Sequence, residues 1–365
     1  MKSTTTEKMN KKISEIESKK LAVEIKIIAK KLGFNQVGIT DINLHNHEQH
    51  LNSWLKKGYQ GEMHYMKKHG TKRSRPEELI EGTQTVISVS MDYLHEEYIG
   101  EELLKNKDKA FISGYALGRD YHKVMKKKLQ KLVDLIKNRI PAHGRVFVDS
   151  GPVLEKALAE KSGLGWIGKN TLLLNKERGS FFFLGEIYTN LNLPLDKVDA
   201  KNHCGSCAAC IDICPTNAIV GPKQLDARKC ISYLTIEYKG SIEEELRPMM
   251  GNRIFGCDDC QLVCPWNKFA QFTQEEDFKP RHNLNNLGLS ELFKWTEEEY
   301  LKKTKGSPIR RAGYESWSRN IAIALGNADT NKEVYDSLMS RKNDPSAIVR
   351  EHVKWALDQH KGKSS

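Results

Sequence analysis

The spacing of apolar residues in the first part of the chain changes between helical and extended patterns. Apolar side chains recur at intervals of three and four over residues 25–32, and Gly33 follows, which predicts a helix that ends at this glycine. The segments 34–40 and 85–93 are short and rich in β-branched residues, so they predict strands. A second helical stripe over residues 119–140 predicts a longer amphipathic helix.

The same mixture continues to residue 200, so we predict an α/β domain over residues 1–200 within an α+β multidomain protein. Pro152 stands in the first turn of a helix predicted at 152–162. Proline is tolerated there, because no intrahelical hydrogen bond needs its missing N–H. The further elements predicted here are short helices within 51–69, a strand at 145–151, a helix at 152–162 and a hairpin of 171–175 with 180–190.

The last part of the chain has a helical pattern. Residues 316–327 and 344–359 resemble each other as helices with apolar residues on one side and arginines on another. This similarity predicts a short HEAT-like α-helical repeat over residues 271–365, with an ordinary helical hairpin as the alternative.

Composition narrows the class of protein. The 365 residues allow two or three domains, and 29% charged with 39% hydrophobic residues is typical of a globular chain. No apolar run approaches the ~20 residues that cross a bilayer, and the polar start lacks a signal-peptide core. We therefore expect a cytoplasmic protein whose cysteines are ligands or catalysts. The net charge of +11 favours an anionic partner such as nucleic acid, although surplus lysine also aids solubility.

The eight cysteines all lie between residues 204 and 264. Four form C-x2-C-x2-C-x3-C-P over 204–215, three form C-x2-C-x3-C-P over 257–265, and Cys230 stands alone. Iron–sulfur clusters require thiolate ligands, and the first run has the spacing of bacterial two-cluster ferredoxins. We therefore predict a small, loop-rich, ferredoxin-like domain with two [4Fe–4S] clusters over residues 201–270.

The spacing also predicts how the cysteines are shared, because the fourth cysteine of such a run binds the other cluster. Structural zinc and buried free thiols are the alternatives, but zinc does not require the C-x3-C-P endings. The prediction is that cluster 1 takes Cys204, Cys207, Cys210 and Cys264, and that cluster 2 takes Cys214, Cys230, Cys257 and Cys260.

Three glycines, Gly163, Gly165 and Gly168, form the pattern G-x-G-x-x-G. A dinucleotide site needs a strand before this pattern and a helix after it. Here a helical stretch precedes the glycines and a strand-like stretch follows, so we predict instead that the glycines let the backbone approach something flat and bulky, or simply make a tight connection.

The stretch 147–171, the cysteine run 203–219, Cys230 and the second run 257–267 together resemble the epoxyqueuosine reductase family, and the resemblance covers nearly the whole chain. It implies an oxidoreductase with cobalamin in the α/β domain beside one cluster. The implied substrate is a tRNA with a GUN anticodon that carries epoxyqueuosine at the wobble position. Two electrons and two protons would remove the epoxide oxygen as water and leave queuosine.

In this family electrons are expected to pass through the clusters one at a time, from an external donor that is a flavodoxin, a ferredoxin or a reductase. The protein supplies binding, orientation and protons, while the cofactor carries the reduction. The segment 120–125 lacks the glycine of the D-x-H-x-x-G motif that ligates cobalt in other corrinoid proteins, so we expect no histidine ligand. We expect a monomer.

Asp149 follows the apolar strand of residues 145–148. A carboxylate at a strand end beside a cavity can have a raised pKa and donate a proton. The alternative is a cap for the helix predicted to begin at Pro152. The resemblance assigns Asp149 as the catalytic proton donor.

The resemblance also suggests residues that bind the cofactor, since a corrin carries amide and phosphate groups that need polar partners. Surface charge explains several of these residues equally well. The candidates are Lys72, Arg73, Tyr115, Asp149, Lys169, Asn170, Ser232 and Thr235.

Basic residues are concentrated in two places. Residues 117–145 contain nine Lys or Arg against two Asp, and arginines flank Trp317 in the last part of the chain. Such surfaces bind phosphates, and arginine beside an aromatic ring suits unstacked RNA bases. A solvated helix face is the alternative. The candidate tRNA contacts are Lys126, Lys127, Arg310, Arg311 and Arg319.

Two other functions share some of these features. A corrinoid-dependent small-molecule reductase of the reductive dehalogenase type would use the same cofactors, but it needs no basic helical tail and usually carries an export signal. A ferredoxin-type electron carrier would not need the 200 residues that precede the cysteines.

Overall fold

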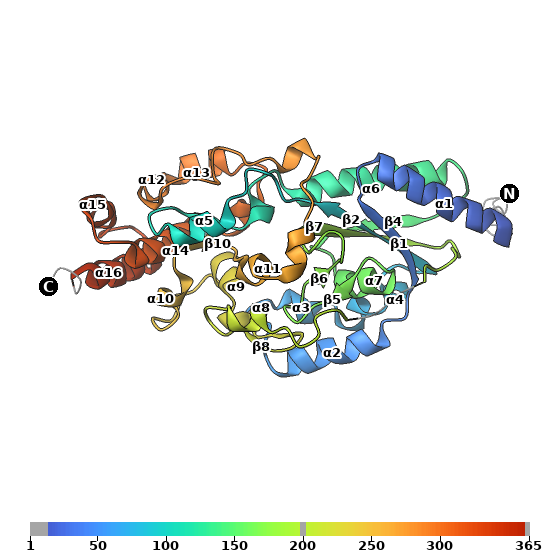
Figure 1. Cartoon of the computed structure of the whole chain (residues 1–365), viewed down its shortest axis with the longest axis horizontal. Helices are drawn as coiled ribbons and strands as arrows, with labels where there is room; N and C mark the ends of the chain where they lie inside the picture. Colours follow the sequence, from blue (N-terminus) through green and yellow to red (C-terminus); the bar gives the residue numbers. More distant parts are fainter. Residues whose placement is uncertain (1–13, 198–201, 362–365) are drawn as a thin grey trace, which may run out of the picture.

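A four-stranded antiparallel sheet forms the centre of the first part of the molecule in the computed structural model, which describes residues 14–197 and 202–361. All eight residues of both middle strands are buried, because helices cover the two faces of the sheet (Figure 1). In spatial order the strands are β1 (Gln36–Asp41), β2 (Thr85–Asp92), β7 (Phe182–Thr189) and β4 (Gly144–Phe147).

One face of this sheet is covered by α1 (Glu15–Lys31) and α6 (Tyr121–Lys137), and α7 (Glu155–Lys161) lies on the other (Figure 1). A capping box at Ser14 begins α1, and the side chain of Asp120 caps α6. The predicted long helix is therefore confirmed, and its apolar stripe is buried while its lysines point outward.

The predicted hairpin of 171–175 with 180–190 is wrong. The first segment contributes β6 (Leu173–Leu174), which pairs with β5 (Trp166–Ile167), while β7 pairs with β2 and β4. A β-carbon on Gly165 would collide with the carbonyl oxygen of Leu174. Gly165 thus permits a close approach between two segments of the chain itself, in agreement with the prediction of a tight connection.

Smaller elements surround the sheet and carry the cysteines. The strand β10 (Arg253–Phe255) pairs in parallel with β3 (Phe111–Ile112), which joins the cysteine-bearing segment to the first part of the chain. The other elements up to residue 278 are α2 (His45–Lys56), α3 (Tyr65–Lys68), η2 (Gly70–Arg73), α4 (Pro76–Leu79), α5 (Gly100–Lys105), η3 (Gly114–Ala116), α8 (Ala209–Asp212), β8 (Ile219–Gly221), β9 (Gln224–Leu225), η4 (Ala227–Lys229), α9 (Ile231–Ile236), α10 (Arg247–Met250), α11 (Asp259–Leu262), η5 (Pro265–Phe269) and η6 (Glu276–Phe278).

The last part of the chain is helical, and its core is continuous with that of the cysteine-bearing segment. One hydrophobic cluster extends from Ala110 through Ile231 and Phe255 to Leu357, so it crosses residue 270, where we predicted a domain boundary. The helices are α12 (Leu289–Phe293), α13 (Glu297–Lys303), η7 (Pro308–Arg311), α14 (Tyr314–Asn327), α15 (Lys332–Ser340) and α16 (Ala347–Lys361), and α16 ends at the opposite extreme of the long axis from α1 (Figure 1).

The guanidinium of Arg319 ties this helical part to α9. It is fully buried in α14 and donates hydrogen bonds to the carbonyl oxygens of Leu234, Tyr238 and Gly240. The prediction that Arg319 contacts tRNA is therefore wrong, and the neighbouring Trp317 is buried as well. Among the described residues, none of the helices is long and apolar enough to cross a membrane.

Candidate active site

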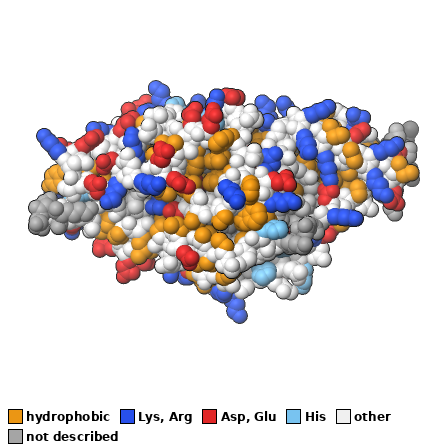
Figure 2. Space-filling view, viewed as in Figure 1, with side chains coloured by type: hydrophobic (Ala, Val, Ile, Leu, Met, Phe, Trp, Pro, Cys, Tyr) orange, Lys and Arg blue, Asp and Glu red, His pale blue; other side chains and the backbone are white. Residues whose placement is uncertain are grey.

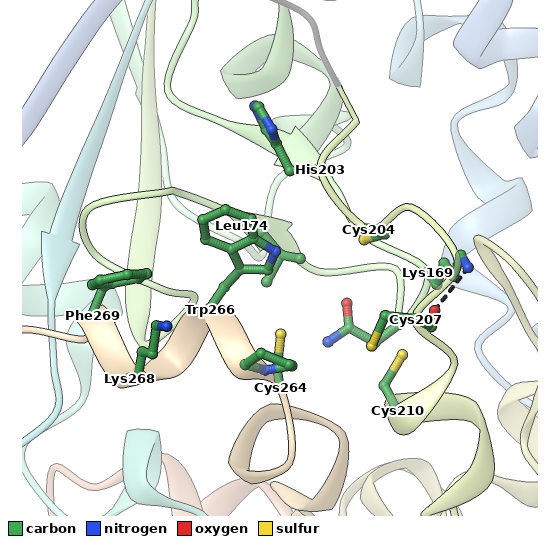
Figure 3. A pocket seen from close by; sticks show the side chains of 12 residues that line it. Lys169, Leu174, His203, Cys204, Cys207, Cys210, Cys264, Trp266, Lys268 and Phe269 are labelled. Carbon is green, nitrogen blue, oxygen red and sulfur yellow. Dashed lines mark hydrogen bonds between the residues drawn. The ribbon is translucent and has the colours of Figure 1, made fainter.

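The eight cysteines divide into two sets of four, each set lining its own cavity, and all eight thiols are free. Figure 3 shows the sulfur atoms of the first set around a common space of about 340 Å³. The second cavity has a volume of about 540 Å³. Cys204, Cys207, Cys210 and Cys264 line the first, and Cys214, Cys230, Cys257 and Cys260 line the second.

The local backbone explains why the last cysteine of each run lines the cavity of the other run. Two short helices, α8 and α11, each carry the middle cysteine of a C-x2-C-x3-C unit and pack against each other. The chain turns after each helix, so Cys214 and Cys264 leave their own run and reach the opposite cavity. Burial raises the pKa of the Cys257 and Cys260 thiols well above the usual value, so their ionisation requires a compensating positive charge.

Lys169 and Asn170 link the two cysteine runs through hydrogen bonds to their backbones. The ammonium of Lys169 donates to the carbonyl oxygens of Gly205 (2.8 Å) and Cys207 (2.7 Å), within the first cysteine run (Figure 3). The amide of Asn170 donates to the carbonyl oxygen of Cys260 at 3.2 Å, and its side chain lines both cavities.

Asp149 lies in the second cavity, in a left-handed backbone conformation (φ 48°) after the end of β4. The phenol of Tyr121 donates to its Oδ2 at 2.6 Å, and Nε2 of His122 lies 3.2 Å from the same oxygen. No hydrogen bond within the described part of the chain ends on Oδ1. The side chain is 46% exposed and lines the second cavity.

Two sequence-based expectations for Asp149 are corrected by this geometry. The helix α7 begins at Glu155 with Leu154 as its cap, so Asp149 is not a helix cap. Burial favours the neutral acid, but the hydrogen bonds from His122 and Tyr121 outweigh it and lower the pKa of Asp149 below its usual value. At neutral pH, with the second cavity open, Asp149 is therefore a carboxylate.

His122 and Tyr121 were missed as functional residues, because their positions just inside a helix resemble ordinary first-turn residues. The available signal was the adjacency of Asp120, whose Oδ1 lies 2.8 Å from Nδ1 of His122. Burial by itself lowers the pKa of His122, but the hydrogen bonds with Asp120 and Asp149 raise it to about 9. A cationic imidazole therefore touches the candidate proton donor at neutral pH.

Two further carboxyl groups lie behind Asp149. Oε2 of Glu155 accepts a hydrogen bond from the backbone N–H of Asp149 at 3.1 Å. Burial and the charge of Asp149 raise the pKa of Glu155 to about 8. Glu186 is fully buried on β7, neither oxygen of its carboxyl group has a hydrogen-bond partner among the described residues, and burial raises its pKa well above the usual value. Both groups are neutral acids near pH 7.

The predicted cofactor residues are only partly brought together. Tyr115, Asp149, Asn170 and Ser232 line the second cavity. The other four candidates do not line it. Lys72 is exposed elsewhere, and the buried Arg73 donates a hydrogen bond to the carbonyl oxygen of Tyr65. Lys169 lines the first cavity, and the hydroxyl of Thr235 forms hydrogen bonds with the backbone of Ile231 and Gly256.

The remaining tRNA candidates are exposed. Lys126 and Lys127 lie on the outer side of α6, and Nζ of Lys126 is 3.5 Å from Oγ of Ser150, the residue after Asp149. Arg310 is exposed in η7. Arg311 lines the second cavity and forms an ion pair with Glu237 at 2.8 Å. Arg311 therefore lines the Asp149 cavity, and Lys126 lies next to the loop that carries Asp149.

Two cysteine-lined cavities, one of them shared with a carboxylate and an imidazolium, define an iron–sulfur oxidoreductase. The model for a 4Fe-4S double cluster binding domain matches residues 203–267, and the model for Epoxyqueuosine reductase QueG, DUF1730, matches residues 73–150. The epoxyqueuosine reductase of Pseudomonas aeruginosa is 57% identical over 349 residues, covering 95% of this chain and 97% of its own. That of Escherichia coli is 52% identical, covering 94% and 90%. The chain belongs to the epoxyqueuosine reductase family.

Solved structures agree with this family. A structure of epoxyqueuosine reductase with a tRNA-Tyr epoxyqueuosine-modified stem loop has a TM-score of 0.83 at 28% identity, over 93% of this chain and 90% of that one. A structure from Streptococcus thermophilus has the same score, identity and coverage. Neither the small-molecule reductase nor the electron-carrier alternative is favoured by these similarities.

Proposed function

We propose that this chain reduces epoxyqueuosine to queuosine at the wobble position of tRNAs with a GUN anticodon, with loss of the epoxide oxygen as water. The observation that carries the proposal is the second cavity, where Asp149 shares one space with four cysteines of a protein in the epoxyqueuosine reductase family. The test is anaerobic incubation of the cluster- and cobalamin-loaded protein with an epoxyqueuosine-containing anticodon stem loop. Mass spectrometry should detect loss of one oxygen atom from the modified base, and an unchanged base would contradict the proposal.

The two [4Fe–4S] clusters are proposed to bind as the spacing predicts, cluster 1 in the first cavity and cluster 2 in the second. The lining of each cavity by one predicted set of four supports this assignment. The two clusters would have different surroundings, because Cys207 of the first set is exposed, whereas Cys230 and the rest of its set line the same cavity as Asp149. Cluster 1 is then the outer and cluster 2 the inner centre.

Cobalamin is the cofactor that we propose for the second cavity, where it would supply the reduction of the epoxide. Aromatic rings and a few polar groups form the lining, as a broad, flat cofactor requires. Tyr115, Asn170 and Ser232 are the residues proposed to hold its polar periphery. The lining contains one histidine, His122, and both its nitrogens contact carboxylates, which supports binding without a protein nitrogen on cobalt.

Asp149 is proposed as the proton donor to the oxygen that leaves the epoxide. Both hydrogen bonds that it accepts end on Oδ2, so Oδ1 is available to the substrate. Because Asp149 is a carboxylate at neutral pH, the proton must first come from His122, which is protonated and touches Asp149. Asp149 then passes this proton to the leaving oxygen. Tyr121 and Asp120 act as positioning residues, because they orient the carboxylate and the imidazole respectively.

The tRNA is proposed to lie across the mouth of this cavity, between Lys126 and Lys127 on α6 and Arg310 and Arg311 on η7. The exposure of these four cations, with Arg311 in the lining of the cavity and Lys126 beside Ser150, supports this arrangement, because an anticodon stem loop presents phosphates around its bases. We further propose that α14 and α16 form a HEAT-like unit, and that the functional regions follow the predicted boundaries at residues 200 and 270.

A further inference from the structure

The first cavity has a basic and aromatic rim. Lys169, His203 and Lys268 line it, and no Asp or Glu does so among the described residues. The ring of Trp266 lies 5.2 Å from that of Trp166 and 5.6 Å from that of His203, measured between centroids. Figure 3 shows Trp266, Lys268 and Phe269 side by side along one edge of the space that the four cysteines surround.

Apolar groups of this rim and of the chain segment that follows it are open to solvent. The side chain of Phe269 is 39% exposed and that of Phe272, three residues later, is 57% exposed. Nζ of Lys268 lies 4.8 Å from the centroid of the Phe269 ring, so a cation and an aromatic face are presented together. Figure 2 shows hydrophobic side chains near the middle of the face on which Figure 1 places α11, the helix that leads into η5. An exposed apolar patch rimmed by charge is typical of a protein-binding surface.

The rim of the first cavity lies where an external electron donor can reach cluster 1. The tRNA base must occupy the second cavity, next to Asp149, so an electron donor cannot use that opening during turnover. The exposed Cys207 makes the first cavity the part of the cluster domain that a donor can approach.

We propose that Trp266, Lys268, Phe269 and Phe272, which we call the donor face, dock an acidic one-electron carrier protein of the flavodoxin or ferredoxin class. This inference rests on the proposed function. In each encounter the carrier loses one electron and the chain gains one, and two encounters supply the two electrons that, with two protons, convert the epoxide to an alkene and water.

The chemistry of the donor face suits this partner. A rim whose described lining residues include cations and no carboxylate attracts an acidic surface and raises the association rate at low salt. Tryptophan and phenylalanine supply affinity when they become buried, and a small patch keeps the complex short-lived, as repeated one-electron transfer requires.

The test uses the cluster-loaded full chain with reduced flavodoxin and, separately, reduced ferredoxin. The variants are Lys268→Glu and Phe269→Ser, and the matched control is Lys332→Glu, a charge reversal on α15 at the far end of the molecule. Two quantities are measured: the Kd of the oxidised carrier, and the second-order rate of cluster reduction followed by absorbance. Dithionite reduction of the same samples reports on the clusters themselves.

The expected result is a carrier-driven rate at least ~10-fold lower in Lys268→Glu at low salt, a weaker Kd in both variants, and no change in dithionite reduction or in Lys332→Glu. High salt should remove most of the difference between Lys268→Glu and the unmodified chain. The proposal is overturned if neither carrier reduces the unmodified chain, if both variants react like it, or if dithionite reduction slows equally. A chain that accepts electrons normally but leaves epoxyqueuosine intact would instead contradict the proposed function.

Discussion

Tyr121 and Asp149 are joined by a 2.6 Å hydrogen bond from the phenol to Oδ2, although they are 28 residues apart and lie on different elements. The bond holds the carboxylate in its left-handed loop and, with His122, keeps its pKa low. Candidate proton chemistry in this protein therefore depends on a group of three side chains rather than on Asp149 alone.

Replacement of Asp149 by Asn should abolish most turnover while leaving the fold and the clusters intact. The amide has the same size and can still accept the hydrogen bond from Tyr121, but it cannot donate an acidic proton. Because general acid catalysis contributes ~10²–10⁴-fold, we expect turnover to fall at least ~10²-fold. Tyr121→Phe keeps the carboxyl group and should cost less. Near-normal turnover in Asp149→Asn would exclude the proton-donor role.

The imidazole of His122 should titrate near pH 9, and this pKa should depend on Asp149. The folded-state pKa lies above the ordinary value of about 6.5, so its stabilising effect is complete below about pH 6.5 and is lost as the pH rises through about 9. NMR of histidine-labelled protein can follow the ring. In Asp149→Asn the pKa should move down toward 6.5 without reaching it, because Asp120 remains. An unchanged pKa would contradict the contact.

Cys230→Ala should damage one cluster and spare the other. Two cubanes require roughly eight iron atoms per chain, and the proposed assignment gives Cys230 to the inner cluster alone. We expect the iron content after anaerobic reconstitution to fall by up to half, with the remaining EPR signal that of one cluster. Cys207→Ala is the matched variant for the outer cluster. Two intact clusters in Cys230→Ala would refute the assignment.

Charge reversal at Lys126 and Lys127 should weaken tRNA binding and reduce its salt dependence. Each phosphate contact that is lost lowers the slope of log K against log[salt] by somewhat less than one unit. Binding of an unmodified anticodon stem loop at several salt concentrations measures this slope. Lys332→Glu, on α15, serves as the control. A slope equal to that of the unmodified chain would remove α6 from the RNA-binding surface.

Arg319→Met should destabilise the protein without direct effect on RNA contacts. The guanidinium is fully buried and satisfies three carbonyl oxygens near α9, which methionine cannot do. Each unsatisfied buried acceptor costs ~1–3 kcal/mol, so the midpoint of thermal unfolding should fall by several degrees. Differential scanning fluorimetry gives the midpoint. If stability is retained but tRNA affinity falls, the assignment of Arg319 to the interior is incorrect.

Features that depend on local spacing could be predicted from the amino-acid sequence. Apolar periodicity defined α6 and the strands β1 and β2, because one turn or one pleat sets which side chains share a face. The cysteine spacing indicated the same two sets of four that line the two cavities, because a two-residue gap lets neighbouring thiolates converge and a proline directs the next one away.

Features that depend on contacts between distant segments could not be predicted from the sequence and became visible in the folded chain. The strand β6 pairs with β5 rather than β7, because Gly165 allows a close backbone approach whose partner segment the local pattern does not identify. Arg319 looks like a surface cation in the sequence, yet carbonyl groups of a distant segment bury and satisfy it. The low pKa of Asp149 likewise comes from partners on α6, since a pKa is set by the charges and hydrogen bonds that folding brings near.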